Sequence, residues 1–203
     1  KRKDTLVLHS TSNNIRNTLL KQKKFQEAKK WILRSVKIID FKAFIDACHQ
    51  NGIAVVLDIA LNHAFSQNSL AQMYWDAANS KPSKDNPWLN PDAKHPYNVG
   101  SDFNHESAAT KYYVDRVLKY WVEEFKIDGF RFDLSKGFTQ NNSGSDVGLW
   151  GKYDQSRINI IDRMGKQLWK LDSGLFLILE HFADNDEETV LSNLGFMLWG
   201  NLV

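Results

Sequence analysis

Residues 53–61 read Ile-Ala-Val-Val-Leu-Asp-Ile-Ala-Leu, and this stretch decides the fold class. It is rich in β-branched side chains and apolar except for Asp58, a pattern typical of a strand buried on both faces in a parallel sheet. Residues 41–48 carry apolar side chains at helical spacing, and the pair Asn51 and Gly52 that follows is typical of a helix end. The sequence therefore predicts a helix followed directly by a buried parallel strand.

The rest of the chain continues this alternation of helices and strands. Two more apolar runs predict buried strands, and apolar residues at helical spacing predict the helices between them. The predicted elements are a helix over residues 106–125, a strand over 127–133, a helix over 153–171, a strand over 175–179, a short helix around 190–194 and the start of a fourth strand within 195–202. This order indicates parallel βαβ units with right-handed crossovers. Residues 134–150 are expected to form a loop.

A long irregular stretch interrupts the alternation after the first strand. Residues 64–105 hold all four prolines of the chain, together with Trp75, Trp88 and Tyr97. Loops of this length are uncommon in compact domains unless they serve a site. We therefore expect this stretch to border a functional site.

The overall composition is that of an ordinary globular protein. Hydrophobic residues make up 42% and charged residues 25% of the 203 residues, which argues against a disordered, collagen-like or disulfide-rich chain. The single Cys48 cannot form an internal disulfide. No apolar run approaches the roughly 18–20 residues that a membrane-spanning helix needs, so no membrane span is expected.

The modest net charge hides two unlike parts. Residues 1–37 hold eleven Lys or Arg against Asp4 and Glu27, whereas residues 38–203 hold fifteen Lys or Arg against twenty-two acidic residues. This shift predicts a boundary near residues 35–40, with a basic leader of unknown role before it. The leader could bind nucleic acid or a membrane surface, but a solvated helix face is the favoured interpretation, and no nucleic-acid partner is expected.

Polar side chains stand where each predicted strand ends. In parallel α/β folds, the carboxyl ends of the strands carry the active site. Because the strand interiors are apolar, charged groups there are costly unless they are exposed, paired or used. The strand-end residues are Asp58, Asn62 and His63 for the first strand, Arg131 and Asp133 for the second, and Glu180 for the third.

Arg131 and Asp133 lie two residues apart on a strand, so their side chains point to the same face, away from Phe130 and Phe132. The neighbouring guanidinium would keep Asp133 ionised, which suits a nucleophile. Glu180 follows five apolar residues, which suits a proton donor. Two carboxyl groups with these opposite roles, about 5–5.5 Å apart, are what retaining glycoside hydrolysis requires.

Each of these residues also has a purely structural interpretation. A single Asp at a strand end is more often a helix cap or an ion-pair partner than a catalytic group. Arg131 and Asp133 could be a structural ion pair, and His63 could be a core histidine bonded to a backbone carbonyl. Three polar strand ends of the same kind together favour a functional site.

At these residues the sequence resembles the α-amylase family of glycoside hydrolases. Asp58-Ile-Ala-Leu-Asn-His63 is similar to that family's first signature, on the third barrel strand. Gly129-Phe-Arg-Phe-Asp133 is similar to the second, on the fourth strand, and Glu180 to the third, on the fifth. The resemblance covers residues 38–203. It implies a partial (β/α)8 TIM barrel of strands three to five or six, with residues 64–105 as an irregular B-domain-like excursion.

The resemblance also implies a role for each matching residue, and calcium as a candidate cofactor, since many members of the family bind it. Asp133 and Glu180 would be catalytic, as the nucleophile and the general acid and base. Substrate contacts are implied for Arg131, His63, Lys136 and His181, structural support of the site for Asp58, and a calcium ligand for Asn62.

The implied activity is retaining cleavage or transfer of α-glucosidic bonds in starch-like α-glucans. The sequence departs from the family where His often follows the Lys, because Gly137 follows Lys136 here. The family's fourth signature has no match in the chain, so these residues alone are expected to be inactive and to self-associate through open barrel edges. The alternative is a non-catalytic carbohydrate-binding or interaction fragment. The resemblance suggests an extracellular or periplasmic location, although the chain shows no signal peptide.

Overall fold

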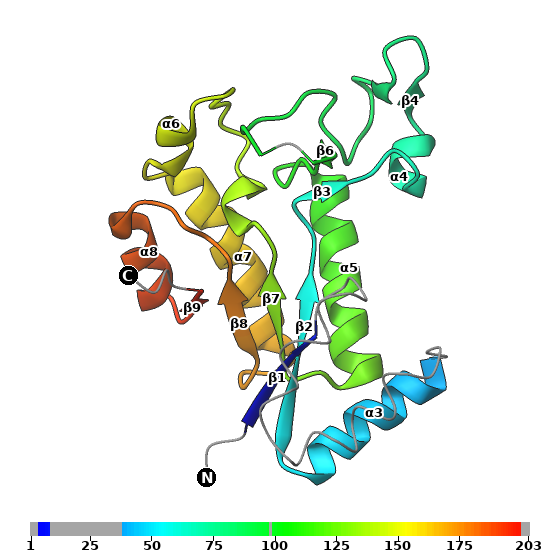
Figure 1. The fold of residues 1–203 in the computed structure, drawn as a ribbon, viewed down its shortest axis with the longest axis vertical. Coiled ribbons are helices and arrows are strands. Elements are labelled where there is room, and N and C mark those ends of the chain that lie inside the picture. Colours follow the sequence, from blue (N-terminus) through cyan, green and yellow to red (C-terminus); the bar gives the residue numbers. More distant parts are fainter. Residues whose placement is uncertain (1–3, 9–37, 98, 200–203) are drawn as a thin grey trace.

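A five-stranded parallel sheet is the centre of the fold (Figure 1). The computed structural model describes residues 4–8, 38–97 and 99–199. The sheet has the order β1-β2-β7-β8-β9, and each strand is parallel to its neighbours. The strands are β1 (Asp4–Leu8), β2 (Ile53–Ile59), β7 (Gly129–Phe132), β8 (Phe176–Leu179) and β9 (Met197–Leu198). This confirms the parallel α/β sheet predicted from the sequence.

Helices connect the successive strands of the sheet. These helices are α3 (Ile38–Gln50), α5 (Ala108–Phe125), α7 (Gln155–Leu171) and α8 (Asn185–Asn193). Side chains cap two of them: the Ser107 hydroxyl accepts from the Ala109 amide at the start of α5, and Asp154 accepts from the first amides of α7. Helices α5 and α7 lie on the same side of the sheet (Figure 1), as in the outer ring of a barrel.

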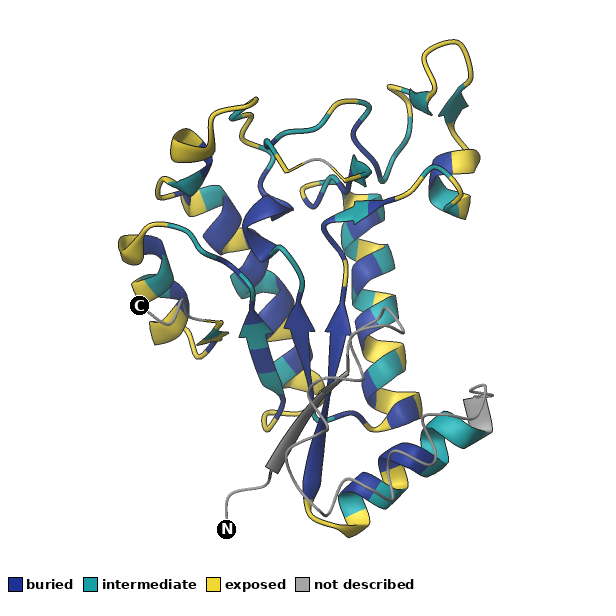
Figure 2. Cartoon of the chain, in the orientation of Figure 1, coloured by how far each residue is buried: buried dark blue, intermediate teal, exposed yellow. Residues whose placement is uncertain are grey.

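The main core lies between the sheet and these two helices. Phe130 and Phe132 of β7 are almost fully buried and belong to the same apolar cluster as Val114 of α5 and Ile161 of α7. Figure 2 shows the central strands β2 and β7 buried along their length, whereas buried, intermediate and exposed residues alternate along the helices. The predicted division of β7 into an apolar face and a polar face is therefore confirmed.

The stretch after β2 is irregular, as predicted, and carries its own small apolar cluster. It contains two short antiparallel pairs and one short helix, but most of it is turn and loop. The elements are β3 (His63–Ala64) paired with β6 (Ser101–Asp102), β4 (Trp75–Asp76) paired with β5 (Lys81–Pro82), and α4 (Ser69–Gln72). Ala71, Leu89 and Phe103 are buried within it. The excursion stands beyond the carboxyl ends of the strands (Figure 1).

The structure differs from the sequence predictions in two places. First, β1 lies inside the predicted basic leader and pairs with β2 from Asp4–Ile53 to Leu8–Leu57, so this part of the leader belongs to the sheet. Residues 9–37 lie outside the described residues. Second, the predicted loop 134–150 contains the 3-10 helix η3 (Ser135–Phe138) and the start of α6 (Val147–Gly151). The start of a fourth strand, predicted within residues 195–202, is β9.

Among the described residues, no helix has the length and apolar character needed to cross a membrane.

Candidate active site

Four charged side chains from three neighbouring strand ends form one ion-pair network. Arg131 Nη1 donates to Asp58 Oδ1 at 2.9 Å and to Asp133 Oδ1 at 2.8 Å. Its other terminal nitrogen, Nη2, lies 2.9 Å from Glu180 Oε2. The two predicted catalytic carboxyl groups, Asp133 and Glu180, are therefore held on the two terminal nitrogens of one guanidinium.

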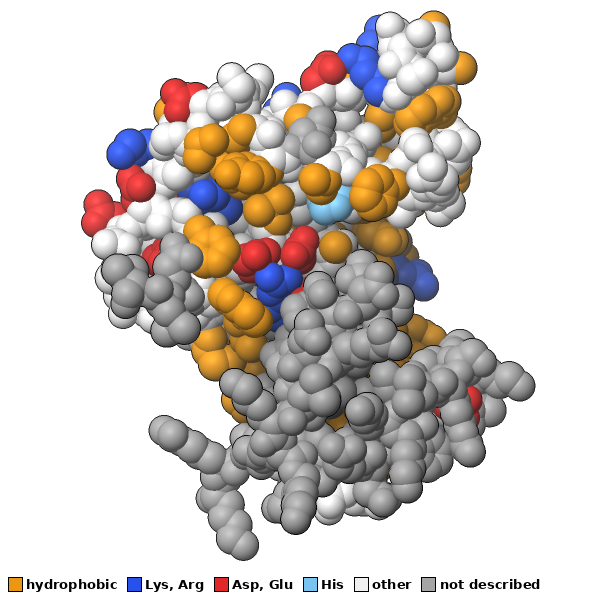
Figure 3. Space-filling view, viewed as in Figure 1, with side chains coloured by type: hydrophobic (Ala, Val, Ile, Leu, Met, Phe, Trp, Pro, Cys, Tyr) orange, Lys and Arg blue, Asp and Glu red, His pale blue; other side chains and the backbone are white. Residues whose placement is uncertain are grey.

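The main chain of the sheet fixes where these side chains stand. Asp133 N donates to Ile59 O of β2, and Glu180 N donates to Phe132 O of β7, so each residue is tied to the strand beside it. The side chain of Asp58 is only 4% exposed, whereas those of Asp133 and Glu180 are 35% and 25% exposed. The network thus has a buried support and two carboxyl groups that a ligand can reach. Figure 3 shows acidic and basic side chains in contact on this face of the molecule.

Arg131 is the centre of this network, and it is buried. Burial alone would lower the pKa of its guanidinium, but the hydrogen bonds and charges of its acidic partners raise that pKa above its ordinary value. The indole ring of Trp199 covers the guanidinium, with 5.1 Å between Arg131 Cζ and the ring centroid. Trp199 directly follows β9 and is 41% exposed. The strand-end rule that selected the other site residues could also have found this one.

Two further predicted site residues, Asn62 and His63, stand at the end of β2. Burial lowers the pKa of the partly buried His63, and the nearby charge of Asp133 acts in the opposite direction. Asn62 is fully buried, and its Nδ2 lies 3.3 Å from His95 Nε2. His63 therefore borders the network of carboxyl groups, while Asn62 turns away from it toward the excursion.

Around Asn62, the structure reveals a buried polar cluster that sequence reasoning missed, made of Asn62, His95 and Asp102. His95 Nε2 lies 3.6 Å from Asp102 Oδ1, and the ring stacks on Trp150 with 4.8 Å between centroids. Asn62 Oδ1, His95 Nδ1 and Asp102 Oδ1 have no hydrogen-bond partner among the described residues. Nothing in the local sequence around His95 and Asp102 points to this cluster.

Burial shifts both titratable groups of this cluster strongly. Loss of solvation lowers the pKa of His95 to about 4, and the charges of His63 and Lys136 act in the same direction. Loss of solvation also raises the pKa of Asp102 to about 6, although the amide and the charge of Lys94 oppose that change. Near neutral pH the cluster therefore holds a neutral imidazole beside a carboxylate.

The same residues test the calcium ligand expected at Asn62. Calcium takes six to eight oxygen ligands, main-chain carbonyl oxygens among them, and the buried side-chain oxygens without a hydrogen-bond partner here are Asn62 Oδ1 and Asp102 Oδ1. The His95 ring contacts both side chains, and no group of three His, Cys, Asp or Glu within the described ranges could hold a metal ion. The calcium ligand at Asn62 stays a prediction, and no step below depends on calcium. A Cβ at Gly137 would overlap Asn62 Oδ1 and His95 Nε2, which explains the departure from the family's His.

Two predicted substrate-binding residues lie behind the site. His181 is 1% exposed, and its ring nitrogens contact Ser135 Oγ at 2.9 Å and Glu187 Oε1 at 2.7 Å. This placement contradicts the substrate contact expected for His181, because both nitrogens are engaged and the ring is buried. Lys136 is also buried, donates through Nζ to Phe182 O at 2.8 Å, and lies over the Trp150 ring.

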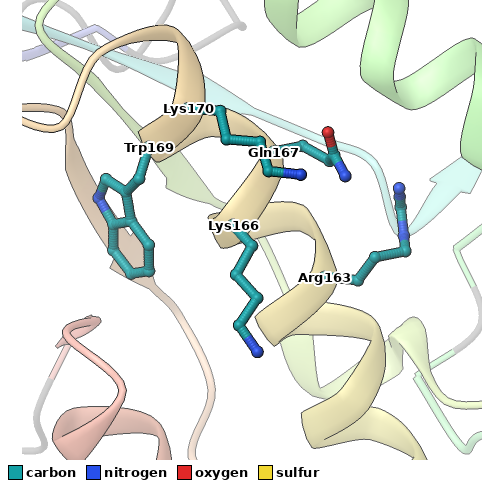
Figure 4. Close-up of a pocket in the computed structure, with 5 residues that line it drawn as sticks. All are labelled: Arg163, Lys166, Gln167, Trp169 and Lys170. Atoms are coloured by element: carbon teal, nitrogen blue, oxygen red, sulfur yellow. The ribbon is translucent and has the colours of Figure 1, made fainter.

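A groove of about 400 Å³ lies elsewhere, on the outer side of α7 (Figure 4). Its residues come from the last two turns of α7, which lead to the beginning of β8 and so lie at the opposite end of the sheet from the carboxyl groups. Two of its cations are already paired, Arg163 with Asp115 and Lys166 with Asp162. This groove is separate from the candidate active site.

Comparison with curated proteins gives relatives that share part of the chain. This chain is 38% identical over 103 residues to a glycogen debranching enzyme of Enterobacter sp., and the match covers 47% of the chain and 15% of the relative. It is 33% identical over 121 residues to isoamylase SU1 of Zea mays, covering 56% of the chain and 15% of the relative. A 1,4-alpha-glucan branching enzyme of Shewanella baltica is 26% identical over 168 residues, a match covering 76% of the chain and 21% of the relative. No family model matches the chain.

Solved structures share the fold. Eubacterium rectale Amy13B matches with a TM-score of 0.61 and 18% identity, over 78% of this chain and 33% of its own. A type I pullulanase of Bacillus subtilis, solved with maltose, matches with a TM-score of 0.50 and 21% identity, over 70% of this chain and 17% of its own.

The resemblance to the α-amylase family of glycoside hydrolases, predicted from the strand-end signatures, is supported by these relatives, and the solved structures share the fold. The named relatives are a debranching enzyme, an isoamylase and a branching enzyme. The chain spans about a fifth or less of their length.

Proposed function

We propose that the chain carries part of the catalytic site of a retaining α-glucan hydrolase or transferase. The observation that supports this most strongly is the attachment of Asp133 and Glu180 to one guanidinium at adjacent strand ends. In this proposal β2, β7 and β8 are the third, fourth and fifth strands of a (β/α)8 barrel, and β9 is the sixth. Residues 64–105 are the B-domain-like excursion.

The proposed mechanism is a double displacement. Asp133 attacks the anomeric carbon, the bond to the leaving oxygen breaks, and Glu180 gives its proton to that oxygen. Glu180 then takes a proton from water or from a sugar hydroxyl, whose oxygen attacks the anomeric carbon and releases Asp133. Arg131 holds the Asp133 carboxylate in place, and His63 lies where it can bind a hydroxyl of the same sugar.

The ion pair between Glu180 and Arg131 places one requirement on this mechanism. Donation of a proton needs the acid form of Glu180, whereas contact with a guanidinium stabilises a carboxylate. Arg131 Nη2 and Leu134 N both contact Glu180 Oε2. The proton for the leaving oxygen would therefore be carried by the other oxygen, Glu180 Oε1.

Trapping of the glycosyl-enzyme intermediate tests the proposal. A fluorinated α-glucosyl fluoride should label Asp133, as read by peptide mass spectrometry, in a protein that carries this sequence together with the fourth signature. Asp133→Asn should remove the label, and Asp115→Asn, on the outer side of α5, should keep it. A label on another carboxyl group would contradict the assignment. We expect the present residues alone to bind glucan with little turnover.

A groove of aromatic side chains favours a second candidate function, α-glucan binding without catalysis. The groove, of about 510 Å³, lies on α5 beside the excursion, and its aromatic lining is Trp88, Tyr112, Tyr113, Tyr120 and Trp121. Exposed aromatic faces suit the apolar faces of sugar rings, and Tyr112 is 65% exposed. Retention on a starch resin that is lost in Tyr112→Ala, but unchanged in Asp133→Asn, would favour this function.

A further inference from the structure

The segment that carries Glu180 is joined to the segment that follows β7 by a row of hydrogen bonds. Leu134 N donates to Glu180 Oε2 at 3.0 Å, and Ser135 N donates to Glu180 O at 2.9 Å. Lys136 Nζ donates to Phe182 O at 2.8 Å. Three consecutive residues after β7 therefore hold Glu180 and Phe182 after β8, and one of the contacts is made directly to the Glu180 carboxyl group.

Both segments contain a residue in the left-handed backbone region. Leu134 has a φ of 47° and Phe182 a φ of 55°, values that cost energy for side chains larger than glycine. Such conformations persist only where the surrounding contacts enforce them. The structure must therefore supply a rigid support behind these two turns.

That support is the buried ion pair between Arg157 and Glu187. Their side chains are 1% and 0% exposed, and the pair is bidentate, with Nε to Oε1 at 2.5 Å and Nη2 to Oε2 at 2.6 Å. The remaining N–H groups of Arg157 are directed to main-chain carbonyl oxygens, at distances of 3.0 to 3.2 Å. These oxygens belong to Lys136, Trp150 and Lys152.

The ion pair reaches Glu180 through two further side chains. Glu187 Oε1 accepts from His181 Nε2 at 2.7 Å, and His181 Nδ1 lies 2.9 Å from Ser135 Oγ. Ser135 Oγ also lies 3.0 Å from Glu180 O, so its single proton serves either the imidazole or the carbonyl. Every residue in this path, from Glu187 to Ser135, is buried.

We propose that the Arg157–Glu187 ion pair is a positioning device for Glu180, acting through His181 and Ser135. It fixes the turn after β7, and this turn directs the Leu134 amide at the Glu180 carboxyl group. The significance of that carboxyl group rests on the proposed function. The contacts to be tested do not depend on catalysis.

Amide NMR on the whole chain tests this role without any measurement of turnover. In Glu187→Gln, amide hydrogen exchange at Leu134 and Ser135 should accelerate at least about tenfold, while exchange in the sheet interior, for example at Leu57, should stay slow. The Leu134 amide proton should also move upfield, because it loses a charged acceptor. A role in global stability alone would change exchange throughout the sheet and leave the Leu134 shift of the folded state unchanged.

Two variants make the test independent of how well Glu187→Gln folds. Ser135→Ala keeps the ion pair but removes the link, so the Leu134 amide should respond while the Asp154 amide, which donates to Glu187 Oε2 at 2.8 Å, should not. Asp115→Asn is the matched control, because it weakens another Arg–carboxylate pair, which joins Asp115 of α5 to Arg163 of α7 and includes none of the site residues. An unchanged Leu134 amide in folded Glu187→Gln, or in Ser135→Ala, would overturn the proposal.

Because these measurements do not use substrate, they also separate the two proposals. If Asp133 is not labelled but the Leu134 amide changes in the variants as expected, the catalytic function is rejected and the positioning role is kept. Labelling of Asp133 with no response at Leu134 would reject the positioning role alone.

Discussion

Two buried polar clusters flank the candidate active site, and they differ in how completely their polar groups are paired. In the Arg157–Glu187 cluster, the guanidinium is bonded through all three nitrogens and the carboxylate through both oxygens. In the cluster of Asn62, His95 and Asp102, three buried polar atoms lack a hydrogen-bond partner among the described residues. The first cluster supports the Glu180 side of the site, and the second supports the His63 side.

The degree of pairing decides whether the stability of each cluster responds more to mutation or to pH. A fully paired buried ion pair has little to gain by rearranging, but removing one partner leaves an uncompensated charge. A partly paired cluster already bears the cost of desolvation, which appears as the shifted pKa values of His95 and Asp102. We therefore expect the first cluster to be sensitive to mutation and the second to be sensitive to pH.

The largest effect is expected from removing one member of the paired cluster. Glu187→Ala should lower the free energy of unfolding by about 3–5 kcal/mol, because Arg157 would remain buried without a counter-charge. Urea unfolding followed by circular dichroism gives this value. A loss below about 1 kcal/mol would show that the cluster is less constrained than its contacts indicate.

The second effect is a pH dependence of the free energy of unfolding, which should appear when either His95 or Asp102 is replaced. Asp102, with a folded pKa of about 6, makes stability fall as pH rises from about 4 to 6, since the folded state binds the extra proton. His95, with a folded pKa of about 4, makes stability rise between about pH 4 and 6.5, since the unfolded state binds the extra proton. In the parent protein the two slopes oppose each other.

Single substitutions should expose each slope. His95→Gln should leave a protein whose stability falls between pH 4 and 6, and Asp102→Asn one whose stability rises, each by on the order of 3 kcal/mol. Unfolding at several pH values in that window measures both. Slopes of the same sign in the two variants would show that the assigned shifts are wrong.

The third effect concerns the space in which the partly paired cluster is packed. Gly137→Ala should cost about 1–3 kcal/mol, because the new methyl group would overlap Asn62 Oδ1 and His95 Nε2. The matched control is Gly151→Ala, where the nearest atom to the new Cβ, Asp184 Oδ1, lies at an ordinary contact distance of 3.7 Å. Neither glycine has a positive φ, so the two variants differ in packing rather than in backbone strain. Equal losses in the two variants would argue against close packing at Gly137.

The smallest effect is expected at the partly exposed ion pair between α5 and α7. Asp115→Ala removes the carboxylate that Arg163 Nη1 contacts at 2.9 and 3.0 Å. Since both side chains are partly exposed, the free energy of unfolding should change by less than about 1 kcal/mol. A loss as large as that of Glu187→Ala would remove the distinction between buried and exposed pairs on α7.

The sequence predicted the parallel sheet and the meeting of Asp58, Arg131, Asp133 and Glu180, because strand ends and side-chain alternation are local patterns. It did not predict the contacts of Arg157 with Glu187, since the two residues lie 30 positions apart and look like ordinary surface charges. The cluster of Asn62, His95 and Asp102 was also missed, because Asn62 lies far in the sequence from His95, which it contacts. Strand β1 was missed because its five residues lie within a strongly basic segment.

In the proposed function, an α-glucan binds at the Asp58–Arg131–Asp133–Glu180 network. The decisive test is a titration of the isotope-labelled chain with a linear maltooligosaccharide, followed by amide NMR. We expect the largest shifts at His63, Asp133 and Glu180, and we expect them to be lost in folded Arg131→Met. Shifts confined to Tyr112 and Tyr120 of the aromatic groove, with none at the strand ends, would contradict this proposal.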